Sequence, residues 1–257
     1  MIICVDMGNT TTTIGLMEGT RAVAFWRVTT RQRTSDEYGL LLGSLLAARG
    51  PELRPDSGGI CSVVPSETGA LAAAVASTFD FEAKIVDGTS DCGVVVEVDD
   101  PGGVGGDRIA NAAGAYYGYG GPAIVVDAGT AMTFDYVTED GKYAGGVIAP
   151  GILAGARDLW EKARMLPEVE IKEPAEVIGA TTITCMQSGI FFGALAQVEG
   201  IVRRMWAEVG EECRIMLTGG QAAFIRNDLS FEVTYDAHLT LKGIAYAVDP
   251  GLRRRSP

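Results

Sequence analysis

The N-terminal part of the chain alternates between short apolar stretches and polar turns. This pattern predicts three strands, over Ile2–Asp6, Thr12–Met17 and Arg21–Val28, with turns at "GNT" and "EGT" between them. After Ser35, tyrosine and leucine recur at helical spacing and predict a helix. The pattern then predicts strands at "GGICSVVP", "AKIVD" and "GVVVEVDDP", and helices at "SETGALAAAVASTF" and "GDRIANAAGAYYGYG".

The same pattern restarts in the second half. "AIVVDAG", "AMTFDYVTEDGKY" and "AGGVIAP" predict three strands around an Asp-Gly turn, and "CRIMLTGG" predicts a later strand. Helices are predicted over Thr182–Val209 and near His238–Val248. The spacing between the two copies of the pattern is too long for a solenoid repeat, so the repetition indicates a duplicated domain. We expect domains over residues 1–118 and 119–257, with the last helix packing on the first half.

The restart repeats an unusual turn, because "VDMGNTTTTIGL" begins at Val5 and "VDAGTAMTFDYV" begins at Val126. Glycine allows close backbone approach, and the N–H groups of such a turn can hold phosphate oxygens. A neighbouring aspartate can then hold Mg²⁺, directly or through water. Either turn alone is also typical of an ordinary β-hairpin. Two copies in the same context favour phosphate binding, and we expect them to hold one nucleotide between them.

Two glycine-led segments add to this interpretation. "LTGGQAAF" places Gly219 and Gly220 between a strand and a helix, where a nucleotide can lie against bare backbone. "GVGGDRIANAAGA" places Asp107 and Arg108 at the start of a helix, where free N–H groups favour anions. An aspartate in this position can equally cap its own helix beside a surface arginine.

Composition and charge narrow the function classes. The chain has 257 residues, of which 47% are hydrophobic and 21% charged, as in globular proteins with sizeable cores. A formal net charge of −12 argues against binding to nucleic acid. Five separated cysteines without a CxxC pair argue against a disulfide framework or a zinc site. We expect a cytoplasmic protein without a signal peptide or membrane span, because no apolar run approaches ~18 residues.

Several motifs occur together in the order seen in one family. They are "DMGNTTT" at Asp6, "DPGGVGGDRIANA" at Asp100, "DAGTAMTFD" at Asp127, "GGVIAPG" at Gly145, "MLPEVE" at Met165 and "TCMQSGIFFG" at Thr184. The chain resembles the superfamily of acetate kinases, sugar kinases, heat-shock chaperones and actin, and within it the type III pantothenate kinases. This resemblance covers nearly the whole chain. It implies an α/β fold of duplicated ribonuclease H-like (actin-like ATPase) domains, each a mixed β-sheet with flanking helices.

The resemblance also implies a reaction, the phosphorylation of pantothenate by ATP-Mg to 4′-phosphopantothenate, the first step of coenzyme A biosynthesis. Asp107 would be the catalytic base, Asp6 would hold Mg²⁺ through water, and Asp127 would bind a monovalent cation, K⁺ or NH₄⁺. The implied substrate-binding residues are Gly105, Gly106, Asp107, Arg108, Thr182 and Val98. The nucleotide-binding residues would be Asp6, Met7, Gly8, Asn9, Thr10, Thr11, Thr12, Thr13, Thr130, Gly219 and Gly220.

The sequence departs from the family pattern at two places in the substrate pocket. Val98 stands nine residues before Asp107, where the family usually has tyrosine, and Ala180-Thr181 precede Thr182, where a polar or basic residue and then Asn or Ser are more usual. ATP use is therefore better supported than the identity of the acceptor. Two alternatives stay open, a kinase of the same superfamily for another small alcohol and a non-catalytic regulator resembling Bvg accessory factor. Thr182 can also be a simple helix cap.

A homodimer is expected from the helix over Thr182–Val209, which would be ~40 Å long. One apolar stripe on it comprises Ile183, Met186, Ile190, Ala194, Val198, Ile201, Met205 and Val209, and a second comprises Phe191, Leu195, Val202 and Trp206. Together they form a face wider than one sheet needs to cover it. The alternative is that the helix is buried within one chain. Family resemblance favours the dimer, with the substrate pocket close to its interface.

Overall fold

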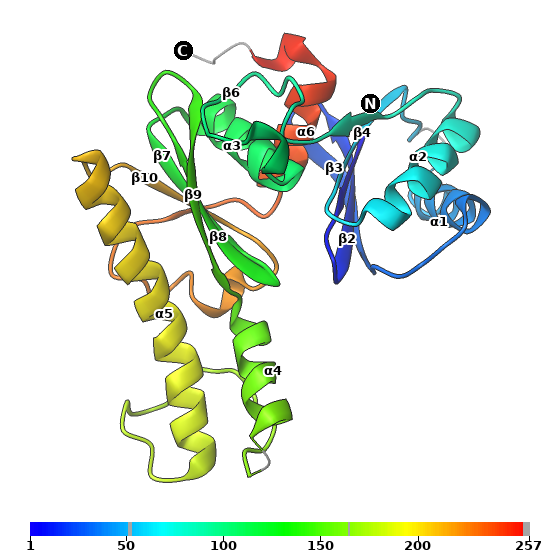
Figure 1. Ribbon diagram of the computed structural model, residues 1–257. Coiled ribbons are helices and arrows are strands. Elements are labelled where there is room, and N and C mark those ends of the chain that lie inside the picture. The colour runs from blue at the N-terminus through cyan, green and yellow to red at the C-terminus, as the bar shows by residue number, and fades with distance from the viewer. Residues whose placement is uncertain (51–52, 164, 254–257) are drawn as a thin grey trace. The chain divides into compact units, whose positions relative to one another are not determined.

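A computed structural model of the protein describes residues 1–50, 53–163 and 165–253 (Figure 1). The chain forms two compact units. Unit 1 comprises Met1–Gly121, Val137–Ala144 and His238–Pro257, and unit 2 comprises Pro122–Tyr136 and Gly145–Ala237. The observed boundaries therefore differ from the expected domains 1–118 and 119–257, because two later segments belong to the same unit as the N-terminal segment.

Unit 1 is built on a mixed five-stranded sheet in the order β3-β2-β1-β4-β5. β1 pairs antiparallel with β2 and parallel with β4. The strands are β1 (Ile2–Met7), β2 (Thr11–Glu18), β3 (Arg21–Thr29), β4 (Ser57–Ser62) and β5 (Lys84–Val86). The helices are α1 (Ser35–Ala47), α2 (Pro65–Phe79), α3 (Gly106–Tyr119) and α6 (Leu239–Val248), with 3-10 turns at Pro101–Gly103 and Pro250–Arg253.

Helices cover both faces of the unit 1 sheet. Successive side chains of β1 point to opposite faces, so alternate residues pack against different helices. Ile3, Val5 and Met7 pack in the cluster that contains residues of α1 and α2. Cys4 packs in the cluster of α3 and α6, so Asp6 belongs to that face too. Figure 1 shows α1 and α2 together on one side of the blue sheet, with α3 and α6 on the other.

α3 and α6 approach closely because each carries a glycine at the crossing. A Cβ atom added to Gly243 would lie 1.7 Å from the carbonyl oxygen of Ala110, and one added to Gly114 would lie 2.5 Å from that of Leu239. The hydroxyl of Thr240 donates a hydrogen bond to the buried Asn111 Oδ1 across the same contact (2.7 Å). This packing explains why the C-terminal helix belongs to unit 1, as the sequence pattern predicted.

Unit 2 contains most of a six-stranded sheet in the order β11-β10-β7-β8-β9-β6. Its elements are β7 (Ala123–Ala128), β8 (Ala131–Val137), β9 (Lys142–Pro150), α4 (Ile152–Lys162), α5 (Thr182–Val209), β10 (Arg214–Thr218), a 3-10 turn (Ala222–Phe224) and β11 (Thr234–Tyr235). β7 runs parallel to β10. The order β9-β8-β7-β10-β11 repeats β3-β2-β1-β4-β5, which is the expected duplication.

β6 is much shorter than the strand predicted at "GVVVEVDDP". It consists of Val95–Val96, which pair with the first residues of β9, Lys142 and Tyr143. Pairing with β6 brings the β8–β9 turn, residues 137–144, into unit 1. A run of valines therefore predicted strand conformation correctly, but only two of its residues have a partner strand.

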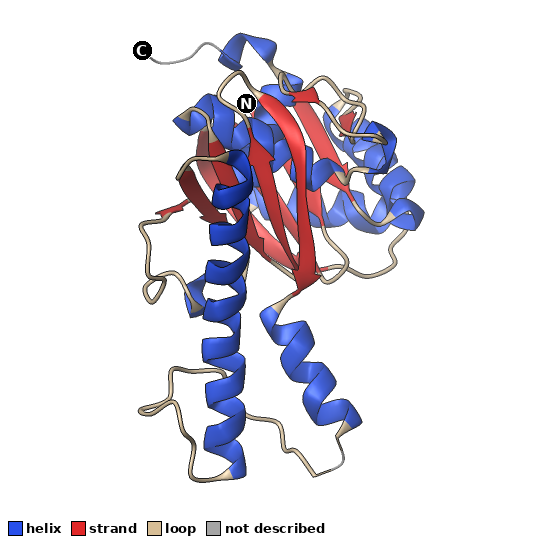
Figure 2. Ribbon diagram, turned by 60° about the vertical axis from the view of Figure 1, so that its left-hand side comes forward, coloured by secondary structure: helices blue, strands red, loops and turns tan. Residues whose placement is uncertain are grey.

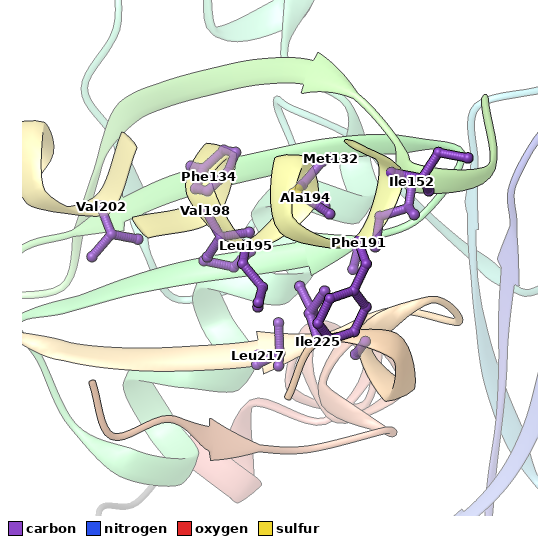
Figure 3. Packing of buried hydrophobic residues seen from close by; sticks show 14 of the residues in the cluster. Met132, Phe134, Ile152, Phe191, Ala194, Leu195, Val198, Val202, Leu217 and Ile225 are labelled. Carbon is purple, nitrogen blue, oxygen red and sulfur yellow. The ribbon is translucent and has the colours of Figure 1, made fainter. Parts of the chain in front are cut away.

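α5 forms the core of unit 2 with the sheet. Phe191, Leu195 and Val198 pack against Phe134 and Leu217 of the strands (Figure 3). In Figures 1 and 2, the N-terminal half of α5 continues past the sheet beside α4. Most residues of both apolar stripes are buried or half-buried in this core, whereas Ile183 is 50% exposed. The unit's own core thus covers most of the face from which a dimer was expected.

Among the described residues, one helix is long and apolar enough to cross a membrane by length and composition. It is α5, whose best window has a mean hydropathy of 1.2 and is 50% buried inside the protein. A core helix in a globular unit has the same properties, and α5 carries the buried polar residues Gln187 and Ser188 in its first turns.

Candidate active site

The first aspartate turn joins β1 to β2 in unit 1. Asp6 lies opposite Thr13 of β2 and Cys61 of β4, and is half-buried. The Gly8 N–H donates to the carbonyl oxygen of Thr11 (3.0 Å), which closes a tight turn. A Cβ on Gly8 would lie 3.1 Å from that oxygen, so the glycine permits a close approach. The turn thus leaves Asn9 and Thr10 exposed at its tip.

Thr30, just after β3, fixes this turn from the side. Its hydroxyl donates to the carbonyl oxygen of Gly8 (2.7 Å) and lies 2.8 Å from the hydroxyl of Thr12. Its N–H donates to the carbonyl oxygen of Thr10 (3.0 Å). Three contacts from one residue therefore hold both sides of the turn. Sequence analysis did not identify Thr30, because these partners come together only when β3 folds beside β2.

The glycine-led start of α3 holds Asp107. The N-cap is Gly105, so Asp107 lies in the first helical turn, where its Oδ1 accepts a hydrogen bond from the Arg108 N–H (2.9 Å). A Cβ on Gly105 would lie 2.5 Å from the same carboxylate oxygen, and one on Gly106 would lie 2.2 Å from the carbonyl oxygen of Val86. The two glycines let the helix start lie against β5 with the carboxylate beside it.

Asp6 and Asp107 belong to one electrostatic environment in unit 1. Burial raises the pKa of the Cys61 thiol well above its ordinary value, and the negative charges of Asp6 and Asp107 raise it further. Burial likewise raises the pKa of Asp107, against the lowering effects of the Arg108 N–H and the Arg108 charge. The Arg108 guanidinium lies 5.7 Å from the ring centre of Tyr143. Both predicted carboxylates of unit 1 therefore act electrostatically on the same buried thiol.

The second aspartate turn, in unit 2, repeats the first. β7 has the same burial sequence as β1, with the aspartate half-buried between buried neighbours. Asp127 lies opposite Thr218 of β10, as Asp6 lies opposite Cys61 of β4. The Gly129 N–H donates to the carbonyl oxygen of Ala131 (3.1 Å), so this turn is one residue shorter than the first. Its tip, Thr130, is exposed.

The Gly-Gly turn after β10 contacts Asp127 directly. Gly219 has a φ of +95°, and a Cβ at this position would lie 2.4 Å from Asp127 Oδ1. Only glycine fits a position with both constraints. Gly220 follows and is exposed. The predicted cation ligand and the predicted nucleotide-binding glycines are therefore neighbours in unit 2.

Two further residues hold the second turn, and sequence analysis missed both. A Cβ on Gly151, the N-cap of α4, would lie 2.3 Å from the carbonyl oxygen of Gly129. Gln221 follows the Gly-Gly turn, and its side-chain amide donates to that same oxygen (2.7 Å). Gly151 ends the motif "GGVIAPG", which was a signal for its importance. Gln221 gave no local signal, since its partner is 92 positions away.

Val98 and Thr182 complete the predicted substrate residues. Val98 is half-buried and packs on the unit 1 cluster that includes α3. Thr182 is the exposed first residue of α5 in unit 2, and the capping role belongs to Thr181, which forms a capping box with Thr184. The alternative interpretation of Thr182 as the helix cap is therefore wrong by one residue.

The described carboxylates suit a metal ion that is bound together with a nucleotide better than one that protein side chains alone would hold. Among residues 1–50, 53–163 and 165–253, no group of three or more His, Cys, Asp or Glu side chains could hold a metal ion. Mg²⁺ in kinases is bound by one or two carboxylates together with substrate phosphates and water. A half-buried carboxylate beside a glycine turn, as at Asp6, supplies that ligand set.

Solved structures share this architecture at low sequence identity. A ROK hexokinase from Thermus thermophilus has a TM-score of 0.55 and 12% identity, with 96% of this chain and 98% of that chain covered. A Baf family protein from Campylobacter jejuni has a TM-score of 0.57 and 17% identity, with 95% and 96% covered. The chain thus has the actin-like ATPase fold, which it shares with this hexokinase. The predicted fold class is confirmed.

Sequence comparison identifies the family within that class. The family model for type III pantothenate kinase matches residues 2–204. The type III pantothenate kinase of Agathobacter rectalis is 41% identical over 247 residues, which cover 95% of each chain. The chain belongs to the type III pantothenate kinase family.

Proposed function

We propose that the protein is an ATP-dependent kinase that phosphorylates pantothenate to 4′-phosphopantothenate, the first step of coenzyme A biosynthesis. Membership of the family over nearly the whole chain is the observation that carries this proposal. The placement of Asp107 supports it, because a half-buried carboxylate at a helix start can meet an acceptor hydroxyl where free N–H groups favour the incoming phosphate.

The proposed mechanism divides the work among the described residues. Phosphoryl transfer has a loose transition state, so positioning and charge neutralisation contribute most. Asp107 orients the primary hydroxyl of the acceptor and accepts its proton late, as the new O–P bond forms. Burial raises the pKa of Asp107, which makes its carboxylate a stronger base than an ordinary aspartate. Arg108 supplies donors to substrate oxygens.

The remaining assignments concern the nucleotide and its ions. Asp6 would hold the ATP-bound Mg²⁺ through water, and this ion would supply neutralisation of the phosphate charge. In unit 1, residues 7–13 would bind the nucleotide phosphates. In unit 2, Thr130 would contact ATP, Gly219 and Gly220 would lie beside the nucleotide, and Asp127 would bind K⁺ or NH₄⁺. The proposed acceptor-binding residues are Gly105, Gly106 and Val98 in unit 1 and Thr182 in unit 2.

Product detection tests the acceptor. The protein is incubated with ATP, Mg²⁺, K⁺ and a panel of small alcohols that includes pantothenate, and products are identified by mass spectrometry. We expect phosphorylated pantothenate. Phosphorylation of another alcohol alone would support a different kinase of the same superfamily, which Val98 makes a real alternative. No phosphorylation of any alcohol, with nucleotide still bound, would support a non-catalytic regulator.

We further propose a cytoplasmic homodimer without nucleic-acid or membrane partners. Exposed apolar residues support the dimer, because Val177, Ile178 and Ile183 are 65%, 86% and 50% exposed just before and within the first turn of α5, and Met165 is 92% exposed. Light scattering on a sizing column tests this. An active species with the mass of one 27.0 kDa chain at micromolar concentration would contradict it.

A further inference from the structure

Gln221 is a residue outside the predicted site that contacts both the second aspartate turn and the start of α4. It immediately follows the Gly-Gly turn, and only 9% of its surface is exposed. Its side-chain Nε2 donates to the carbonyl oxygen of Gly129 (2.7 Å), and its Oε1 accepts from the N–H of Leu153 (2.9 Å). Its own N–H donates to the carbonyl oxygen of Ala128 (2.8 Å).

We propose that Gln221 is a positioning residue for nucleotide binding, which locks the second aspartate turn to the start of α4. The inference rests on the proposed function in so far as this turn binds ATP. All of its contacts lie within unit 2. They join segments that are 92 and 68 positions from Gln221 in the chain.

The bonds to the turn fix the direction of its peptide groups. In a planar trans peptide the C=O and N–H point in opposite directions. Holding the carbonyl of Gly129 therefore also fixes the N–H of Thr130, which belongs to the same peptide. N–H groups in such turns are the groups that bind phosphate oxygens. Gln221 thus acts on phosphate binding through the backbone, without touching the nucleotide.

The bond to α4 adds a second constraint. The first N–H groups of a helix have no partner within the helix. Gln221 Oε1 accepts from one of them, at Leu153, while the N-cap Gly151 donates its N–H to the carbonyl oxygen of Thr130 (3.2 Å). The turn and the helix start are therefore joined twice, and glutamine suits the position because its amide has a donor and an acceptor.

Two variants separate this role from simple burial. Gln221→Leu removes both side-chain hydrogen bonds at similar volume. Gln221→Glu keeps an acceptor for the Leu153 N–H. It replaces the donor Nε2 with a carboxylate oxygen, which would face the carbonyl oxygen of Gly129 and repel it. The matched control is Gln187→Leu, since buried Gln187 on α5 also donates its side-chain amide to a backbone carbonyl in unit 2, that of Glu170 (3.0 Å).

The experiment measures ATP-Mg binding by titration calorimetry, KM for ATP and for pantothenate, kcat, and the thermal midpoint. We expect both Gln221 variants to bind ATP at least about five-fold more weakly, in line with lost buried hydrogen bonds. KM for ATP should rise in parallel, while KM for pantothenate stays within about two-fold. Gln187→Leu should leave ATP binding within about two-fold of wild type, because its partner Glu170 belongs neither to the aspartate turn nor to the start of α4.

Wild-type ATP affinity in Gln221→Glu would overturn the proposal, as would an equal rise in both KM values. If Gln221→Leu fails to fold, Gln221→Glu decides alone, since it retains the bond to α4. The binding measurement needs no acceptor, so a wild-type protein that binds ATP without phosphorylating pantothenate contradicts the proposed function and leaves the role of Gln221 testable.

Discussion

Asp107 experiences two opposing influences on its charge. Burial disfavours the carboxylate and raises its pKa, whereas the Arg108 N–H and the Arg108 charge favour it and lower the pKa, and burial is the larger effect. A carboxylate with a raised pKa is a better proton acceptor while it is still ionised. The same environment makes the ionised form unfavourable for folding, so function and stability oppose each other at this residue.

Asp107→Asn should therefore abolish turnover without destabilising the fold. Loss of a general base lowers the rate by at least ~10²-fold. Since the folded pKa is raised, the folded protein binds more protons than the unfolded chain between the two pKa values, and stability falls as pH rises through that window. The neutral amide avoids this loss. Kinetics and urea unfolding at neutral pH test both effects, and a rate above a tenth of wild type would refute the base role.

The pH profile should show the same shift. We expect kcat/KM to fall as pH decreases through the pKa of Asp107, with a midpoint above ~3.9, the value of an ordinary aspartate. Rates measured in overlapping buffers at constant ionic strength test this, with thermal unfolding as a control for acid denaturation. A profile that stays flat down to the ordinary aspartate range would contradict the raised pKa.

Thr30→Val should weaken ATP binding, because the isosteric change removes the hydroxyl that holds Gly8 and Thr12. An unsatisfied buried group costs roughly 1–3 kcal/mol. We expect KM for ATP to rise more than KM for pantothenate, and Thr30→Ser to restore it. Thr29→Val is the control, since Thr29 is the exposed neighbour of Thr30 and the last residue of β3. Equal kinetics for the two valine variants would exclude the positioning role.

Among single residues, the sequence predicted those that stand in a recognisable short motif. Asp6, Asp107 and Asp127 stand in short motifs next to glycines, and each lies at the strand or helix end where the pattern put it. Thr30 and Gln221 could not be found in this way. Their side-chain hydrogen bonds join them to residues 18 to 92 positions away. A threonine after a strand or a glutamine after two glycines is therefore unremarkable until the sheets form.

Among the elements, the crossing of α3 and α6 is the tightest described contact between helices of unit 1. It places the Cα of Gly243 against the backbone of Ala110, with no room for a methyl group. α3 carries Asp107 at its start, so the crossing also fixes the helix that bears the proposed base. Glycine in a helix is intrinsically unfavourable, and here the packing explains its presence.

Gly243→Ala should destabilise unit 1 by at least about 1–3 kcal/mol, because overpacking must push the helices apart. Gly69→Ala is the matched control. Gly69 is exposed in α2 with nothing within 4 Å of an added Cβ, so alanine should stabilise by roughly 0.5–1 kcal/mol. Urea unfolding of both variants tests this. A Gly243→Ala protein as stable as wild type would show that the helices are not in this contact.

The elements themselves were predictable to different degrees. The bounds of α5 agree with the sequence pattern, because a capping box at Thr181 and a glycine at Gly210 mark its ends. β6 was overpredicted, since valine favours strand conformation but cannot supply a partner strand. The burial of the α5 stripes was also not predictable, as an apolar face does not reveal whether its own chain or a second copy covers it.

For the whole molecule, the clearest expectation concerns ions. If Asp127 binds a monovalent cation, activity should be high in K⁺ or NH₄⁺ and low in Na⁺ or Li⁺, which differ in size and hydration. Asp127→Asn should abolish the difference among the four salts. Rates at matched ionic strength test this, with ATP-Mg held at saturation. Equal wild-type rates in all four salts would exclude the assignment.

The last segment of the chain that belongs to unit 1 begins at His238. A ribosome delivers the chain from its N-terminus, so the sheet of β1–β5 emerges long before α6, whose Leu241 and Ile244 cover Gly15 and Gly59. Unit 2 ends at Ala237 and needs nothing that is synthesised later. Domains usually complete their folding in the order of synthesis. For this chain we expect the reverse order, so a released chain truncated after Ala237 should resist protease over unit 2 while its first 121 residues are still cleaved.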